Sequence, residues 1–112
     1  MRTSRRRRTS VGGVRGRFVD LVERQLDLFA EEHVGLIGDC EAALRAYDRA
    51  PCDEAEERYG DYLDLVDAGR EALVECQDAF ARSLDPPQRE EYEDVFARTV
   101  RKRFPRFALE LD

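Results

Sequence analysis

One stretch of the sequence, residues 18–50, constrains the fold most, because it keeps helical spacing over thirty-three residues without a proline. Its apolar residues recur at alternating intervals of three and four, which places them on one stripe of an α-helix. At the usual rise per residue this helix would be about 50 Å long. It must therefore pack its stripe against the rest of the chain. The stripe comprises Val19, Val22, Leu26, Phe29, His33, Leu36, Cys40, Ala43 and Tyr47.

A second helix is predicted over residues 54–84. Pro51 ends the first helix, because the residue before a proline disfavours helical backbone angles. Asp53 is then the expected N-cap, and Glu56 completes a capping box. A short connection between two helices of similar length predicts an antiparallel hairpin. The apolar stripe of the second helix consists of Ala55, Tyr59, Tyr62, Val66, Gly69, Leu73, Cys76 and Phe80.

A third, shorter helix is predicted from its N-cap, Asp85, to about Phe104. Pro86 fits the first helical position, where a missing N–H costs nothing, and Pro105 ends the helix. We therefore predict an all-α fold over residues 17–112, in which a long antiparallel helical hairpin and a shorter third helix form an open three-helix bundle. The basic end of the third helix should approach the acidic start of the second. The residues concerned are Arg98, Arg101, Lys102 and Arg103 on one side and Asp53, Glu54, Glu56, Glu57 and Asp61 on the other.

The net charge of −6 is unevenly distributed along the chain. Residues 1–17 carry seven arginines and no acid, whereas the remaining residues carry twelve bases and twenty-five acids, which gives +7 and −13. Residues 1–16 also lack large apolar side chains other than Met1, so we expect a disordered Arg-rich arm. Three interpretations stay open: a polyanion-binding arm, a solvated tail, or a segment upstream of a true start at Val11 or Val14. The candidate polyanion contacts are Arg5, Arg6, Arg7 and Arg8.

Three cysteines and one histidine are the residues that most readily suggest catalysis or metal binding. In the predicted hairpin Cys40 and Cys76 lie about 20 Å apart along the bundle, with Cys52 at the turn. This spacing fits neither a disulfide nor a zinc site. A carboxylate-bridged di-iron site needs more than one histidine. We expect free thiols, no catalytic residue, no metal, no cofactor and no enzymatic activity.

His33 lies on the apolar stripe, opposite Gly69 and Arg70 in the predicted hairpin. A glycine in mid-helix costs about 1 kcal/mol relative to alanine, so Gly69 needs an explanation. Room for the imidazole of His33 would supply one. We expect His33 to be a structural residue rather than a ligand or a catalytic base.

The turn end of the hairpin is a candidate interface, because the third helix is too short to cover it. We expect that helix to cover residues 18 to about 37, where Phe18, Leu21 and Leu28 widen the apolar stripe. The alternating tail, residues 106–112, is expected to extend over part of the uncovered patch, leaving the rest to a partner or a second subunit. Its deletion should lower stability and promote association. The candidate interface residues are Leu44, Tyr47, Tyr59, Tyr62, Leu63, Phe107, Leu109 and Leu111.

These features favour a small, non-enzymatic interaction protein that works through helix-mediated self-association or association with a protein partner. The alternative is a nucleic-acid-associated protein, anchored only by its arginine-rich arm, because the body is too acidic to attract a polyanion. No apolar run approaches the roughly 20 residues that a membrane span requires, so no membrane association is expected. We expect a cytoplasmic location.

Overall fold

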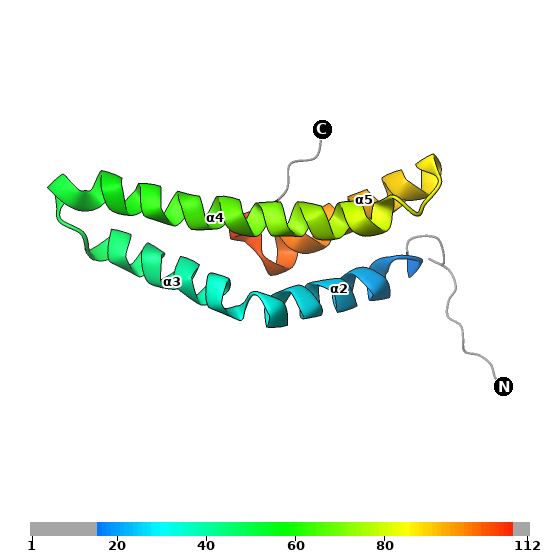
Figure 1. Ribbon diagram of the computed structural model, residues 1–112, viewed down its shortest axis with the longest axis horizontal. Helices are drawn as coiled ribbons and strands as arrows, with labels where there is room; N and C mark the ends of the chain where they lie inside the picture. The colour runs from blue at the N-terminus through cyan, green and yellow to red at the C-terminus, as the bar shows by residue number, and fades with distance from the viewer. Residues whose placement is uncertain (1–15, 109–112) are drawn as a thin grey trace.

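The computed structural model describes residues 16–108 and is built from α-helices, with one short 3₁₀ helix and no strand in that range. Figure 1 shows the order of the elements along the chain. The predicted all-α class is confirmed. The expectations for residues 1–15 and 109–112 lie outside the described residues. The elements are α2 (Val19–Glu32), α3 (Val34–Arg49), α4 (Cys52–Ala81), α5 (Pro86–Arg103) and the 3₁₀ helix η2 (Pro105–Phe107).

The prediction of one continuous helix over residues 18–50 was wrong, because the chain breaks at His33 between α2 and α3. His33 has φ −119° and ψ 30°, outside the helical region. Its backbone N–H donates to the Phe29 carbonyl at 2.9 Å, and its Nδ1 lies 3.1 Å from the same oxygen. The imidazole also stacks on the Phe29 ring, with 4.6 Å between centroids. The regular helix is therefore interrupted at His33, and the chain bends between α2 and α3, as Figure 1 shows.

The helix boundaries follow the prolines as predicted. Ala50 is extended, with ψ 142°, and α4 starts immediately after Pro51. The capping box at the start of α4 was a wrong prediction, because Pro51 occupies the N-cap and Asp53 lies within the first turn. Asp85 does occupy the N-cap of α5, before Pro86, but its side chain makes no capping hydrogen bond. Proline therefore sets these boundaries through backbone geometry rather than through side-chain caps.

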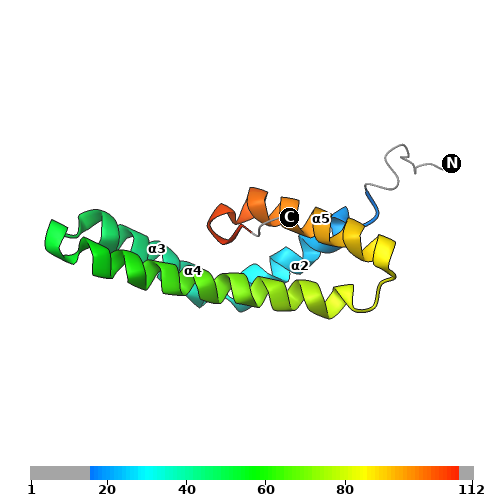
Figure 2. The ribbon, with the colours of Figure 1, turned by 90° about the horizontal axis from the view of Figure 1, so that it is seen from above.

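The helices form an elongated molecule with principal extents of 64 × 30 × 23 Å. Helix α3 runs alongside the first half of α4, whereas α5 packs against both α2 and α4 at the other end (Figures 1 and 2). Figure 2 shows that α5 ends near the middle of α4, so that only α3 and α4 continue toward Pro51. The molecule therefore has one end built from α2, α4 and α5, and one end built from two helices.

The core lies in the end that contains α5. Tyr92 is fully buried there, and its ring packs against Phe80 and Phe18 with centroid distances of 4.8 and 5.5 Å. Its hydroxyl donates to Gln25 Oε1 at 2.8 Å, and burial raises the pKa of Tyr92 above its usual range. The other core residues are Val22, Leu26, Phe29, Cys40, Val66, Leu73, Ala81, Val95, Phe96, Ala97, Val100 and Phe107.

Gly69 makes room for Phe107 and not for His33, which corrects the sequence-based explanation. After Pro105 the chain turns through η2 and returns Phe107 to the core, where its side chain is 1% exposed. A Cβ added to Gly69 would lie only 2.5 Å from Phe107 Cε1. Phe107 also meets the Phe29 ring, at 6.2 Å between centroids. The expectation that the tail is extended from residue 106 is therefore wrong for Phe107.

The basic end of α5 pairs with α2, not with the start of α4 as predicted. Arg103 donates to Glu23 Oε1 at 2.9 Å and to Asp27 Oδ1 at 2.8 Å. Since Phe107 packs on Gly69, α5 ends beside the middle of α4, and Asp61 lies about 12 Å further along that helix. The carboxylates at the start of α4 are therefore beyond the end of α5.

Candidate interaction surface

The end of the molecule built from α3 and α4 alone has an incomplete core. We call residues 41–65 the two-helix arm, because no side chain in this range is buried. The cause is the length of α5, which stops at Arg103, so that among residues 16–108 no third helix lies beside the two-helix arm. Two helices can cover only part of each other's apolar stripe, so the remaining faces of the arm stay accessible.

Three tyrosines form a chain of ring contacts across the arm. The rings of Tyr47 on α3 and Tyr59 on α4 are 5.1 Å apart, and those of Tyr59 and Tyr62 are 6.2 Å apart. Tyr59 remains 44% exposed and the neighbouring Leu63 40% exposed. Tyrosine combines a large apolar ring with a polar tip, which suits a surface that is wet when free and buried when bound.

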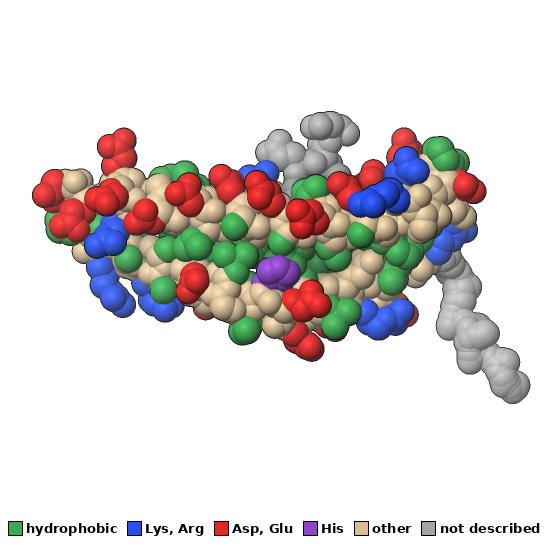
Figure 3. All heavy atoms as spheres, viewed as in Figure 1, with side chains coloured by type: hydrophobic (Ala, Val, Ile, Leu, Met, Phe, Trp, Pro, Cys, Tyr) green, Lys and Arg blue, Asp and Glu red, His purple; other side chains and the backbone are tan. Residues whose placement is uncertain are grey.

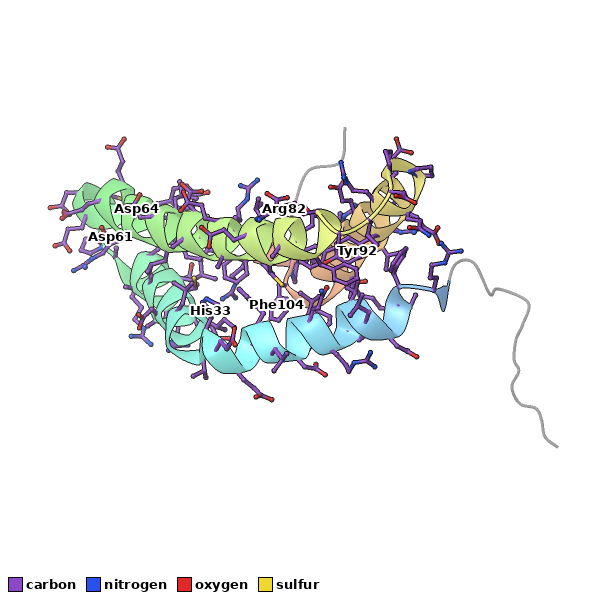
Figure 4. All side chains as sticks on the ribbon, turned by 45° about the vertical axis from the view of Figure 1, so that its right-hand side comes forward. His33, Asp61, Asp64, Arg82, Tyr92 and Phe104 are labelled. Carbon is purple, nitrogen blue, oxygen red and sulfur yellow. The ribbon has the colours of Figure 1, made fainter. Side chains whose placement is uncertain are left out.

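The two-helix arm is acidic. It carries eight carboxylates and three arginines, a net charge of −5. Asp61 and Asp64 project from α4 in Figure 4, and Figure 3 shows carboxylates along the outer side of α4 with hydrophobic side chains in the seam between the helices. Arg58, one of the three arginines in this sum, lies 3.9 Å from Glu54 on its own helix, in an exposed pair of small energetic weight.

The structure places five of the predicted interface residues on the two-helix arm and removes one from it. The five are Leu44, Tyr47, Tyr59, Tyr62 and Leu63, all partly or largely exposed. Phe107 does not belong to this surface, because it is buried on Gly69. Leu109, Leu111 and the candidate polyanion contacts Arg5, Arg6, Arg7 and Arg8 lie outside the described residues.

Other exposed apolar residues were not predicted. Leu28 of α2 was expected under the third helix but is 55% exposed, and Val34, directly after the break, is 70% exposed. Val74 of α4 is 39% exposed. These residues lie outside the two-helix arm. The predicted stripe itself faces inward on both sides of the bend, since Val22, Leu26 and Phe29 of α2 and Cys40 of α3 are buried.

His33 and the cysteines form no chemical centre. Figure 4 shows His33 at the junction of α2 and α3, where its Nδ1 is engaged by the Phe29 carbonyl. Cys40, Cys52 and Cys76 are free thiols, buried, exposed and half-buried respectively. Burial raises the pKa of the Cys40 thiol, with Arg106 opposing the shift, and burial also raises that of Cys76. Within residues 16–108 no three His, Cys, Asp or Glu side chains gather as metal ligands would.

Comparisons with known proteins add no function to this geometry. The sequence matches no protein-family model, and it matches neither a curated protein nor a solved structure. Among the helices of the described range, none combines the length and the apolar character needed to cross a membrane.

Proposed function

We propose that this chain is a small, non-enzymatic interaction protein that acts through helix-mediated self-association or association with a protein partner. In this proposal α2 and α3 form one side of a long antiparallel hairpin with α4, and α5 is the shorter third helix of an open three-helix bundle. The two-helix arm is the docking surface. A helix laid along it would complete the packing that α5 provides at the other end.

One observation carries the proposal: six large apolar side chains, the five candidate interface residues and Leu65, lie on the two-helix arm, yet no side chain between residues 41 and 65 is buried. Contiguous exposed apolar surface is uncommon on soluble monomers and tends to mark interfaces. The same surface contains three tyrosines, a residue type enriched among the side chains that dominate binding energy. Leu28 and Val34 are individually more exposed, and single exposed apolar side chains are normal on protein surfaces.

Site-specific photo-crosslinking in the cells that produce the protein tests this proposal. A photoreactive phenylalanine analogue replaces Leu63, which is 40% exposed, in one variant and Leu28, which is 55% exposed, in the other. We expect a covalent adduct from position 63 and none from position 28, with a mass that distinguishes a second copy from another protein. Equal adducts from both positions, or none from position 63, would contradict the proposal.

The arginine-rich arm supports a second candidate, association with nucleic acid. Seven arginines without an acid in residues 1–17 would neutralise phosphates and release counterions. Binding to a labelled DNA duplex can be followed by fluorescence anisotropy at several salt concentrations. The logarithm of the binding constant should fall with the logarithm of the salt concentration, with a slope of about −0.9 for each phosphate contacted. A variant without residues 1–15 should not bind. Equal binding by that variant would refute this candidate.

A further inference from the structure

The two-helix arm leaves room for a helix of defined length. Phe107 packs on Gly69 where the layer formed by α5 ends, and α4 extends from Gly69 back to its first residue, Cys52. These seventeen residues correspond to about 25 Å of helix surface. The position that α5 fills beside the second half of α4 therefore has no counterpart beside the first half, within the described residues.

Helix α5 shows how this molecule holds a helix in that kind of position. Its apolar side chains, among them Phe96 and Val100, are fully buried. At its flank Arg103, 28% exposed, bridges to two carboxylates of α2 at 2.8 and 2.9 Å. Helix α5 is thus held by an apolar stripe and by a basic side chain that pairs with carboxylates of the neighbouring helix α2.

Charge decides between the available occupants of the two-helix arm. A second copy of the arm would bring −5 against −5, and like charges that flank a helical seam disfavour pairing. The chain's own last four residues, Leu109 to Asp112, bring two leucines but also two carboxylates. Neither offsets the charge of the arm. A basic helix does, in the way that Arg103 offsets Glu23 and Asp27.

We propose that the two-helix arm binds an amphipathic helix of a partner protein, with an apolar stripe that packs on Tyr59 and Leu63 and flanking arginine or lysine residues that meet the carboxylates of α4. This inference rests on the proposed function and adds the chemistry of the partner. It excludes the two-helix arm of a second copy, and the chain's own last four residues, as the main occupant. Steering by opposite charge would speed the association, and salt would slow it.

Three synthetic helical peptides of equal length serve as probes in titrations against the full chain, followed by calorimetry. The first carries leucines at helical spacing with lysine flanks, the second the same leucines with glutamate flanks, and the third the same lysines with the leucines scattered around the helix. Only the first should bind strongly. Its affinity should fall by about tenfold or more in the double variant Tyr59→Ser/Leu63→Ser, as truncation of interface anchors does. The control double variant Leu28→Ser/Val74→Ser should bind like the natural chain.

Each other outcome overturns a defined part of the account. Equal binding of the lysine-flanked and glutamate-flanked peptides would contradict the proposal that the partner helix is basic, but not the proposal that the two-helix arm is a docking surface. Equal binding of the scattered-leucine peptide shows polyelectrolyte attraction and refutes the docked helix. A dimer in sedimentation, lost in Tyr59→Ser/Leu63→Ser, identifies a second copy as the occupant. Binding only after removal of residues 109–112 identifies the chain's own end. If no peptide binds and the protein stays monomeric, this inference is refuted, and photo-crosslinking at position 63 separately decides the proposed function.

Discussion

Substitution of Gly69 by alanine should destabilise the protein, although alanine is the better helix former. The added Cβ would lie 2.5 Å from Cε1 and 2.7 Å from Cζ of Phe107, whose ring is buried, 1% exposed, in the core. Overpacking of this kind costs about 1–3 kcal/mol. The higher helix propensity of alanine returns about 1 kcal/mol. We therefore expect a net loss of up to about 2 kcal/mol in the free energy of unfolding.

The sign of this effect should reverse when the ring is absent. In a Phe107→Ala background the clash disappears and the propensity remains, so Gly69→Ala should stabilise by up to about 1 kcal/mol. Phe107→Ala alone should cost about 3–5 kcal/mol, and Phe107→Leu offers a milder background if the alanine variant does not fold. Urea denaturation followed by circular dichroism measures all four corners of the cycle. A stabilising Gly69→Ala in the natural chain, or an equal loss in both backgrounds, would refute the contact.

Three further predictions follow from the core and its edges. Tyr92→Phe removes the hydrogen bond to Gln25 and should cost about 0.5–1.5 kcal/mol. Burial raises the pKa of Tyr92 in the folded state, so its contribution to stability is complete below the unfolded pKa of about 10 and is lost as pH rises beyond it. The free energy of unfolding should therefore fall less steeply at alkaline pH in Tyr92→Phe than in the natural chain. Parallel declines in the two proteins would contradict this. Arg103→Gln should cost up to about 1 kcal/mol at low salt and less at high salt in urea titrations, and a salt-independent loss would argue against the ion pairs. In the native protein a thiol reagent should label the exposed Cys52 first and the buried Cys40 last, as peptide mass spectrometry can follow; equal rates would contradict the burial of Cys40.

The sequence predicted the features that depend on local backbone chemistry. The ends of the helices at Pro51, Asp85 and Pro105 agree with the structure to within a few residues, because a proline acts on its own backbone and its immediate neighbour. The all-α class followed from the spacing of the apolar residues. The apolar side chains of the two-helix arm were proposed as an interface from helix lengths; none of them is buried, and their role at an interface stays a prediction.

The features that were missed depend on side-chain contacts that the spacing of the apolar residues does not reveal. At the break the His33 ring stacks on the Phe29 ring, and Gly35 and Gly38, which disfavour helix, follow early in α3. The role of Gly69 depends on a turn after Pro105 that brings Phe107 back to α4. The predicted pairing of the first two helices says which of their residues face each other, but it does not show where the segment after Pro105 packs.

The central claim, an open arm that receives a basic helix, is tested most directly by amide hydrogen exchange along α4, with and without the lysine-flanked peptide. In the free protein, residues 52–65 should exchange faster than residues 66–81, because only one helix packs on the first half and two elements pack on the second. Saturation with the peptide should slow exchange in residues 52–65 and leave residues 66–81 unchanged. Uniform protection along α4 in the free protein, or a peptide that protects no residue of the two-helix arm, would contradict the account.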